Sequence, residues 1–102
     1  MKVRRVVFSK VASEHLLEIA HWIGEAASYA VAIRYVERVE AYLYNFDIFA
    51  ERGTRCDDIR QGLRIIGFER RLTIAFTVDA ESVIILGIYR SGQDWASALG
   101  DR

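Results

Sequence analysis

The stretch Leu72-Thr-Ile-Ala-Phe-Thr-Val78 decides the fold class of this chain. Its large apolar residues stand at every second position, which is the period of a half-buried β-strand. Two further strand-length runs flank it, Leu63 to Phe68 and Val83 to Tyr89. The connections, near residues 67–70 and 79–82, are short enough for hairpins. The three runs therefore predict a three-stranded antiparallel meander at the C-terminal end.

Upstream of the meander, the apolar spacing predicts a helix hairpin. Ser9 can cap a first helix that ends at or soon after Gly24, and Ser28 can cap a second helix. Because the break between them is short, the two helices are expected to lie antiparallel. The apolar stripes are Ala12, Leu16, Ile19 and Ile23 in the first helix, and Ala32, Val36, Val39, Leu43 and Phe46 in the second.

The remaining segments complete a two-layer arrangement. Val3 to Phe8 is rich in β-branched residues and predicts a short strand, whereas the polar segment Glu51 to Arg60 is expected to be a loop. The expected fold is α+β, with the N-terminal strand at one edge of an antiparallel sheet and the helix hairpin packed on one face. A chain of 102 residues allows one such domain, spanning residues 1–102.

Composition narrows the classes of function. The 14 basic and 14 acidic residues cancel, so the overall charge does not favour nucleic-acid binding. One local basic cluster stands out, with Arg60, Arg64, Arg70 and Arg71 against Glu69 alone. No apolar run approaches the roughly 20 residues of a membrane span, and the N-terminal apolar stretch is too short for a signal peptide, so a cytoplasmic protein is expected. A single cysteine and two histidines in distant segments suggest neither a metal site nor a cofactor.

The order of elements resembles that of the RelE/ParE superfamily, the toxins of bacterial type II toxin–antitoxin modules, nearly from end to end. This resemblance implies a cognate ParD-like antitoxin, encoded beside the toxin, whose disordered half folds onto it to form a hetero-oligomer. The motifs that carry the resemblance are Phe8-Ser-Lys-Val-Ala12, the long second helix, Arg52-Gly53, Gly62-Leu-Arg64, Arg71-Leu-Thr-Ile-Ala-Phe76, the terminal strand and Asp94-Trp95.

The superfamily contains two activities, and particular residues favour one of them. RelE-like members cut messenger RNA on the ribosome, which without a metal requires cationic groups and a proton donor around one phosphate. Thr73 stands where these nucleases carry Arg, Gly62 stands where a Lys is expected, and no Tyr or His follows Tyr89. The ParE-like activity, poisoning of DNA gyrase, is therefore preferred. Arg90 and Gln93 depart from the common ParE pattern, which has His and Arg at these places.

Two alternatives stay open at this point. The first is a RelE-type endoribonuclease, in which Arg64, Arg71 and Tyr89 would be catalytic. The second is a degenerate member that only binds its antitoxin. Under the preferred reading, the residues expected to contact target or antitoxin are Arg64, Arg71, Arg90, Trp95, Trp22, Tyr35 and Tyr42.

Each of these residues also has a purely structural interpretation. Arg64 could pair with Asp57 or Asp58. Arg71 and Arg90 could either converge on one face of the sheet or be solvated charges at strand ends. Trp95 could anchor the C-terminal tail, and the hairpin aromatics could simply fill the core.

Overall fold

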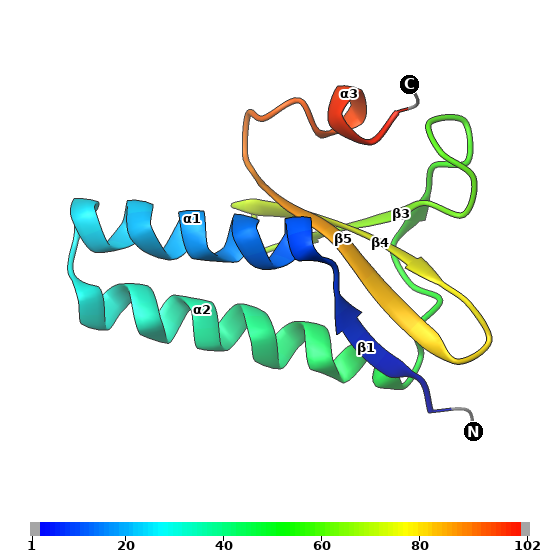
Figure 1. The fold of residues 1–102 in the computed structure, drawn as a ribbon, viewed down its shortest axis with the longest axis horizontal. Coiled ribbons are helices and arrows are strands. Elements are labelled where there is room, and N and C mark those ends of the chain that lie inside the picture. Colours follow the sequence, from blue (N-terminus) through cyan, green and yellow to red (C-terminus); the bar gives the residue numbers. More distant parts are fainter. Residues whose placement is uncertain (1–2, 101–102) are drawn as a thin grey trace.

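Two long helices pack against one face of a five-stranded sheet in the computed structural model, which describes residues 3–100 (Figure 1). This arrangement confirms the predicted two-layer α+β fold. Among the described residues, no helix has both the length and the apolar character needed to cross a bilayer. The elements are β1 (Arg5–Phe8), α1 (Lys10–Ala26), α2 (Tyr29–Tyr44), the 3-10 turn η1 (Asn45–Asp47), β2 (Thr54–Arg55), β3 (Arg64–Phe68), β4 (Leu72–Val78), β5 (Ser82–Arg90) and α3 (Trp95–Leu99).

The strand order across the sheet is β1-β5-β4-β3-β2. Strands β3, β4 and β5 form the predicted antiparallel meander. Strand β1 does lie at an edge, but it runs parallel to β5, so the expectation of a fully antiparallel sheet was wrong. A parallel pair needs a long connection between its strands. Here the helices and strands β2 to β4 supply this long connection between β1 and β5. The apolar pattern of the short β1 does not indicate whether the strand runs parallel or antiparallel to its neighbour.

Two elements arise where the sequence predicted none. Strand β2 lies inside the expected loop, and its Thr54 and Arg55 pair with Ile65 and Arg64 of β3. Helix α3 follows β5, where Asp94 caps it by accepting a hydrogen bond from the Ser97 backbone N–H at 3.2 Å. Both elements are too short for a periodic pattern, so the apolar spacing did not reveal them.

The helices begin where their caps predict. Ser9 Oγ accepts a hydrogen bond from the Ala12 N–H at 3.0 Å, and Ser28 Oγ accepts one from the Val31 N–H at 3.1 Å. The buried stripe of α2 differs at one place, because Tyr35 is buried and Val36 is only half-buried. The helix faces both α1 and the sheet, so a single stripe does not describe its buried surface.

Two apolar clusters occupy the two faces of the sheet. The larger lies beneath the helices and is centred on Phe46 and Phe76, whose rings are 5.1 Å apart. The smaller lies on the opposite face, since its Ala75 alternates along β4 with residues of the larger cluster. Its buried members are Cys56, Leu63, Ala75, Tyr89 and Leu99.

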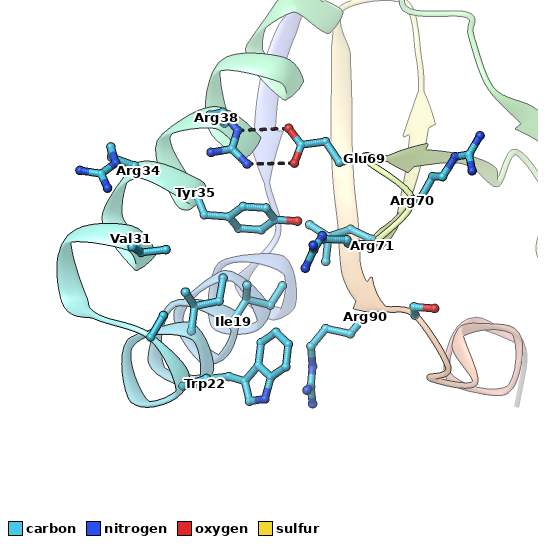
Figure 2. Close-up of a pocket in the computed structure, with 15 residues that line it drawn as sticks. Ile19, Trp22, Val31, Arg34, Tyr35, Arg38, Glu69, Arg70, Arg71 and Arg90 are labelled. Carbon is cyan, nitrogen blue, oxygen red and sulfur yellow. Dashed lines mark hydrogen bonds and ion pairs between the residues drawn. The ribbon is translucent and has the colours of Figure 1, made fainter.

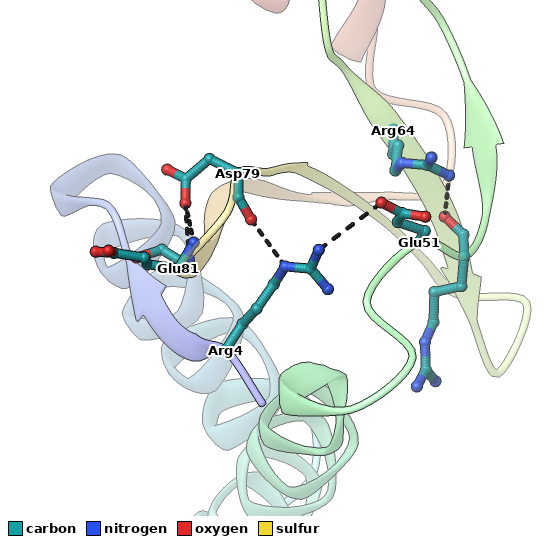
Figure 3. A network of polar contacts seen from close by, with 7 residues as sticks. Arg4, Glu51, Arg64, Asp79 and Glu81 are labelled. Atoms are coloured by element: carbon teal, nitrogen blue, oxygen red, sulfur yellow. Dashed lines mark hydrogen bonds and ion pairs between the residues drawn. The ribbon is translucent and has the colours of Figure 1, made fainter. Parts of the chain in front are cut away.

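Polar contacts tie together the end of the molecule that holds the N-terminal strand (Figure 3). Arg4 Nε donates to the Asp79 carbonyl at 2.8 Å, and Arg4 Nη2 lies 3.8 Å from Glu51 Oε2. Nearby, Arg64 Nη1 donates to the Arg52 carbonyl at 3.2 Å. Arg4 and Arg64 therefore connect segments at this end of the molecule that are distant in sequence.

Candidate functional site: an arginine-lined groove

A groove of about 720 Å³ opens where the α1–α2 turn faces the β3–β4 turn and the end of β5 (Figure 2). Its floor is apolar, because α1 contributes Ile19 and Ile23 and β4 contributes Leu72. Its rim is strongly basic and carries one acidic residue. The charged residues of the rim are Arg34, Arg38, Glu69, Arg70, Arg71 and Arg90.

One rim charge is already neutralised by a partner. Arg38 donates two hydrogen bonds to the Glu69 carboxylate, at 3.1 Å from Nε to Oε2 and 2.9 Å from Nη2 to Oε1. This hydrogen bonding holds the pKa of the Glu69 carboxyl below its ordinary value. The Arg38 guanidinium also lies over the Tyr35 ring, 5.0 Å from its centroid. The pair closes one side of the groove.

The β3–β4 turn supplies the opposite wall in a strained conformation. The Arg71 N–H donates to the Phe68 carbonyl at 3.0 Å, and the two residues between them have positive φ, 52° at Glu69 and 59° at Arg70. Residues with a Cβ disfavour this region by about 1 kcal/mol or more each. As a result, Arg71 points into the groove, whereas Arg70 points away from it (Figure 2).

A buried hydroxyl faces Arg71 across the groove. The Tyr35 side chain is only 8% exposed, and its hydroxyl has no hydrogen-bond partner among the described residues. Burial raises the pKa of Tyr35, so the hydroxyl stays protonated at neutral pH. Figure 2 shows the hydroxyl directed at the Arg71 side chain. Buried polar atoms without a partner are rare in folded proteins, so this one marks the position as unusual.

Arg71 and Arg90 converge on the same opening. Arg90 pairs in register with Leu72, the residue after Arg71, so the two arginines are neighbours across adjacent strands. The Arg90 guanidinium stacks on Trp22, 5.0 Å from the ring centroid. Among residues 3–100, neither arginine has a carboxylate within 4.0 Å. Both arginines are exposed at strand ends and also line the same groove.

Known proteins share this sequence pattern and this fold. The sequence profile of the family described as "ParE toxin of type II toxin-antitoxin system, parDE" matches residues 6–95. The chain belongs to the ParE toxin family. A solved structure described as "Chromosomal ParDE TA system from P. aeruginosa" superposes with a TM-score of 0.76 at 19% identity, over 86% of this chain and 96% of that chain. A search of curated protein sequences finds no match.

In this ParE-family toxin, Arg64 lies far from the groove. It pairs in register with Phe76, which is five residues beyond Arg71 along β4, a separation of about 17 Å at the usual rise of a strand. Its guanidinium contacts the Arg52 carbonyl instead of a carboxylate. The alternative considered from the sequence, an ion pair with Asp57 or Asp58, is absent from the described residues, and Asp57 pairs with Arg55 at 3.0 Å.

Tyr89 and Trp95 lie on the other face of the sheet. Tyr89 is 7% exposed and packs edge-on against His15, with ring centroids 4.9 Å apart. Burial raises the pKa of Tyr89. Trp95 is half-buried at the start of α3 and packs against the smaller apolar cluster, as expected of a residue that anchors the tail. Among the described residues, no group of three or more potential metal ligands occurs.

The hairpin aromatics divide between core and surface. Tyr42 packs against Phe46 and Phe68, and its hydroxyl donates to the Gly67 carbonyl at 3.4 Å, so its ring belongs largely to the core. Trp22, in contrast, is 51% exposed at the mouth of the groove. Arg34, Arg38 and Glu69 were not among the residues expected from the sequence to contact target or antitoxin. The spacing of the two arginines, one turn apart on α2, was the available signal.

Proposed function

We propose that this ParE-family toxin inhibits growth by poisoning DNA gyrase, acting as a protein-binding inhibitor in the cytoplasm. We further propose that a cognate ParD-like antitoxin, encoded by a neighbouring gene, neutralises it by direct binding in a hetero-oligomer. Membership of the family supports the assignment as the toxin of such a module.

The observation that carries the choice of a binder over a nuclease is the dispersal of the candidate catalytic residues. Metal-independent RNA cleavage needs its cationic groups and its proton donor around a single phosphate. Arg64 and Arg71 stand at opposite ends of the β3–β4 hairpin, about 17 Å apart by strand rise. Tyr89 is buried on the opposite face of the sheet among apolar residues. This dispersal supports the gyrase proposal over a RelE-type endoribonuclease.

The groove supports the antitoxin part of the proposal. It combines an apolar floor with Trp22, Arg71 and Arg90 at its mouth, and these residue types are enriched at the centres of protein interfaces. We assign antitoxin contact to these three residues. Tyr35 belongs to the wall of the same groove, whereas Tyr42, Trp95 and Arg64 have structural contacts that already account for them.

The test is controlled expression of the chain without an antitoxin. Growth, induction of the DNA-damage response and messenger RNA integrity are scored in the same cells. We expect growth arrest with DNA-damage induction and intact transcripts, and purified gyrase should accumulate cleaved DNA complexes when the protein is added. Rapid transcript cleavage would instead establish the endoribonuclease. An absence of any phenotype, with soluble folded protein present, would indicate a degenerate member.

A matched variant separates the two chemistries further. Tyr89→Phe removes the hydroxyl of the last tyrosine in the sequence, while its ring keeps the contact with His15. We expect this variant to arrest growth as fully as the unchanged chain. A loss of growth arrest, with the thermal melting temperature unchanged, would contradict the gyrase proposal.

A further inference from the structure

We infer that the groove binds an acidic amphipathic peptide segment and seats one of its carboxylates between Arg71, Arg90 and the Tyr35 hydroxyl. The inference deepens the proposed neutralisation and rests on it, because the segment would belong to the antitoxin. It adds the chemical class of the ligand and the position at which one charged group is recognised.

The first support is the set of unused hydrogen-bond donors. Arg71 and Arg90 have no carboxylate within 4.0 Å among the described residues, and the buried Tyr35 hydroxyl has no partner there. A carboxylate accepts hydrogen bonds on both oxygens, so one group could accept from a guanidinium and from the hydroxyl together. In Figure 2 the Tyr35 hydroxyl is directed at Arg71, and the Arg90 guanidinium lies beside Trp22 at the edge of the same groove.

The second support is the shape and charge of the surroundings. Five arginines and a single glutamate line the rim, although the chain as a whole has no net charge. The apolar floor, with Ile19, Ile23 and Leu72, matches the aliphatic face of an amphipathic peptide. The charge of the groove is thus complementary to a peptide that carries acidic residues beside its apolar ones.

A nucleic acid fits these features less well. A phosphate backbone brings no aliphatic groups for the floor, and Glu69 would face its negative charge at the rim. The chain as a whole also has no net charge, whereas nucleic-acid affinity depends mainly on basic residues that contact phosphates. We therefore assign the groove to a peptide, and the experiment below includes nucleic acid as a competing outcome.

The strained turn is consistent with a binding role. Glu69 and Arg70 occupy left-handed backbone positions that glycine would occupy at lower cost. This conformation orients Arg71 toward Tyr35 and places Glu69 where Arg38 holds it. The Glu69 carboxylate accepts its hydrogen bonds from Arg38 and forms no ion pair with Arg71 within 4.0 Å, so Arg71 keeps its hydrogen-bond donors for a ligand.

The test uses the full-length chain as bait for a random peptide library displayed on phage. One variant, R71Q/R90Q, removes the two charges that face the opening. The matched control, R34Q/R70Q, removes two rim charges whose side chains point away from it (Figure 2). We expect the unchanged chain and the control to select peptides enriched in Asp and Glu beside aliphatic residues. The R71Q/R90Q variant should lose that enrichment.

The most enriched peptide is then titrated against the protein beside a form with its acidic residues changed to Asn or Gln. The unchanged chain should prefer the acidic form by about tenfold or more, which is typical of a charge-assisted contact. Y35F should reduce this preference without lowering the melting temperature, because the hydroxyl has no partner in the free protein. A melting curve for each variant excludes misfolding as the cause.

Several results would overturn the inference. They are failure to select any peptide, selection without acidic enrichment, equal enrichment by R71Q/R90Q, or an unchanged preference in Y35F. Displacement of the acidic peptide by random-sequence DNA at equal concentration would reassign the groove to nucleic acid. Growth arrest is scored separately without antitoxin, so failure of the gyrase proposal is distinguishable from failure of this one.

Discussion

Two regions of this toxin each combine an arginine, an aromatic ring and a residue other than glycine with positive φ, yet their arginines differ in what they contact. The residues with positive φ are Phe49 near η1, and Glu69 and Arg70 beside the groove. Near η1, Arg52 donates to the carbonyls of Ile48 and Phe49, each at 2.8 Å, and to that of Asn45 at 3.4 Å. Its guanidinium also lies 4.4 Å from the centroid of the Phe46 ring.

In the groove, Arg90 makes a similar stacking contact with Trp22 but has no carboxylate beside it among the described residues. Arg71, its neighbour on the adjacent strand, also has no carboxylate within 4.0 Å among the described residues. The comparison shows that the number of arginines in a sequence does not indicate function. What distinguishes a structural arginine from an available one is whether the fold satisfies its donors, so the two regions should respond differently to mutation.

The largest effect is expected at Arg52. Arg52→Ala removes three carbonyl contacts and the stacking on Phe46, and should lower the free energy of unfolding by about 2–3 kcal/mol. Urea denaturation monitored by circular dichroism measures the change. A loss below about 0.5 kcal/mol would mean that water satisfies these carbonyls equally well and would remove the contrast between the two regions.

The turn that walls the groove should respond in the opposite direction. Arg70→Gly relieves a φ of 59° and should raise the free energy of unfolding by about 0.5–1 kcal/mol. The control is Arg60→Gly, at an exposed position without positive φ, where added chain flexibility should lower stability. If both glycines were destabilising, the turn would not be strained.

Removing the available charges should hardly affect folding. The double variant R71Q/R90Q loses one exposed cation–π contact and some mutual repulsion, and we expect its free energy of unfolding to change by less than about 0.5 kcal/mol. The same denaturation experiment compares it directly with Arg52→Ala. A loss as large as that of Arg52→Ala would show that these arginines also hold the fold together.

The smallest effect concerns the exposed pair of Arg38 and Glu69. The hydrogen bonds from Arg38 lower the pKa of the Glu69 carboxyl in the folded protein. The pair therefore contributes its full stability at pH values above the ordinary carboxyl pKa of about 4.3. That contribution is lost as the pH falls through the lower, folded-state pKa. Glu69→Gln should therefore be slightly less stable than the unchanged chain at pH 7 and equal to it at strongly acidic pH. Melting curves across this range, which should also converge at high salt, provide the measurement.

Local patterns predicted a large part of the fold. The capping serines, the helix hairpin and the three strands of the meander all depend on contacts between residues close in sequence, so periodicity and caps reveal them. The family followed from the order of those elements and the short motifs on them. Tyr35 was missed as a core residue because its burial depends on the sheet as well as on the neighbouring helix.

The sequence by itself therefore determined the two long helices, β1 and the strands of the meander, together with their order and the family of this toxin. The tertiary structure alone decided that β1 runs parallel to β5, that β2 and α3 form, and that Arg71, Arg90 and Tyr35 share one groove while Arg64 does not. The physical reason is range. Helices and hairpins form through neighbours along the chain, whereas strand direction and the satisfaction of a guanidinium or a hydroxyl depend on groups that only folding brings within a few ångströms.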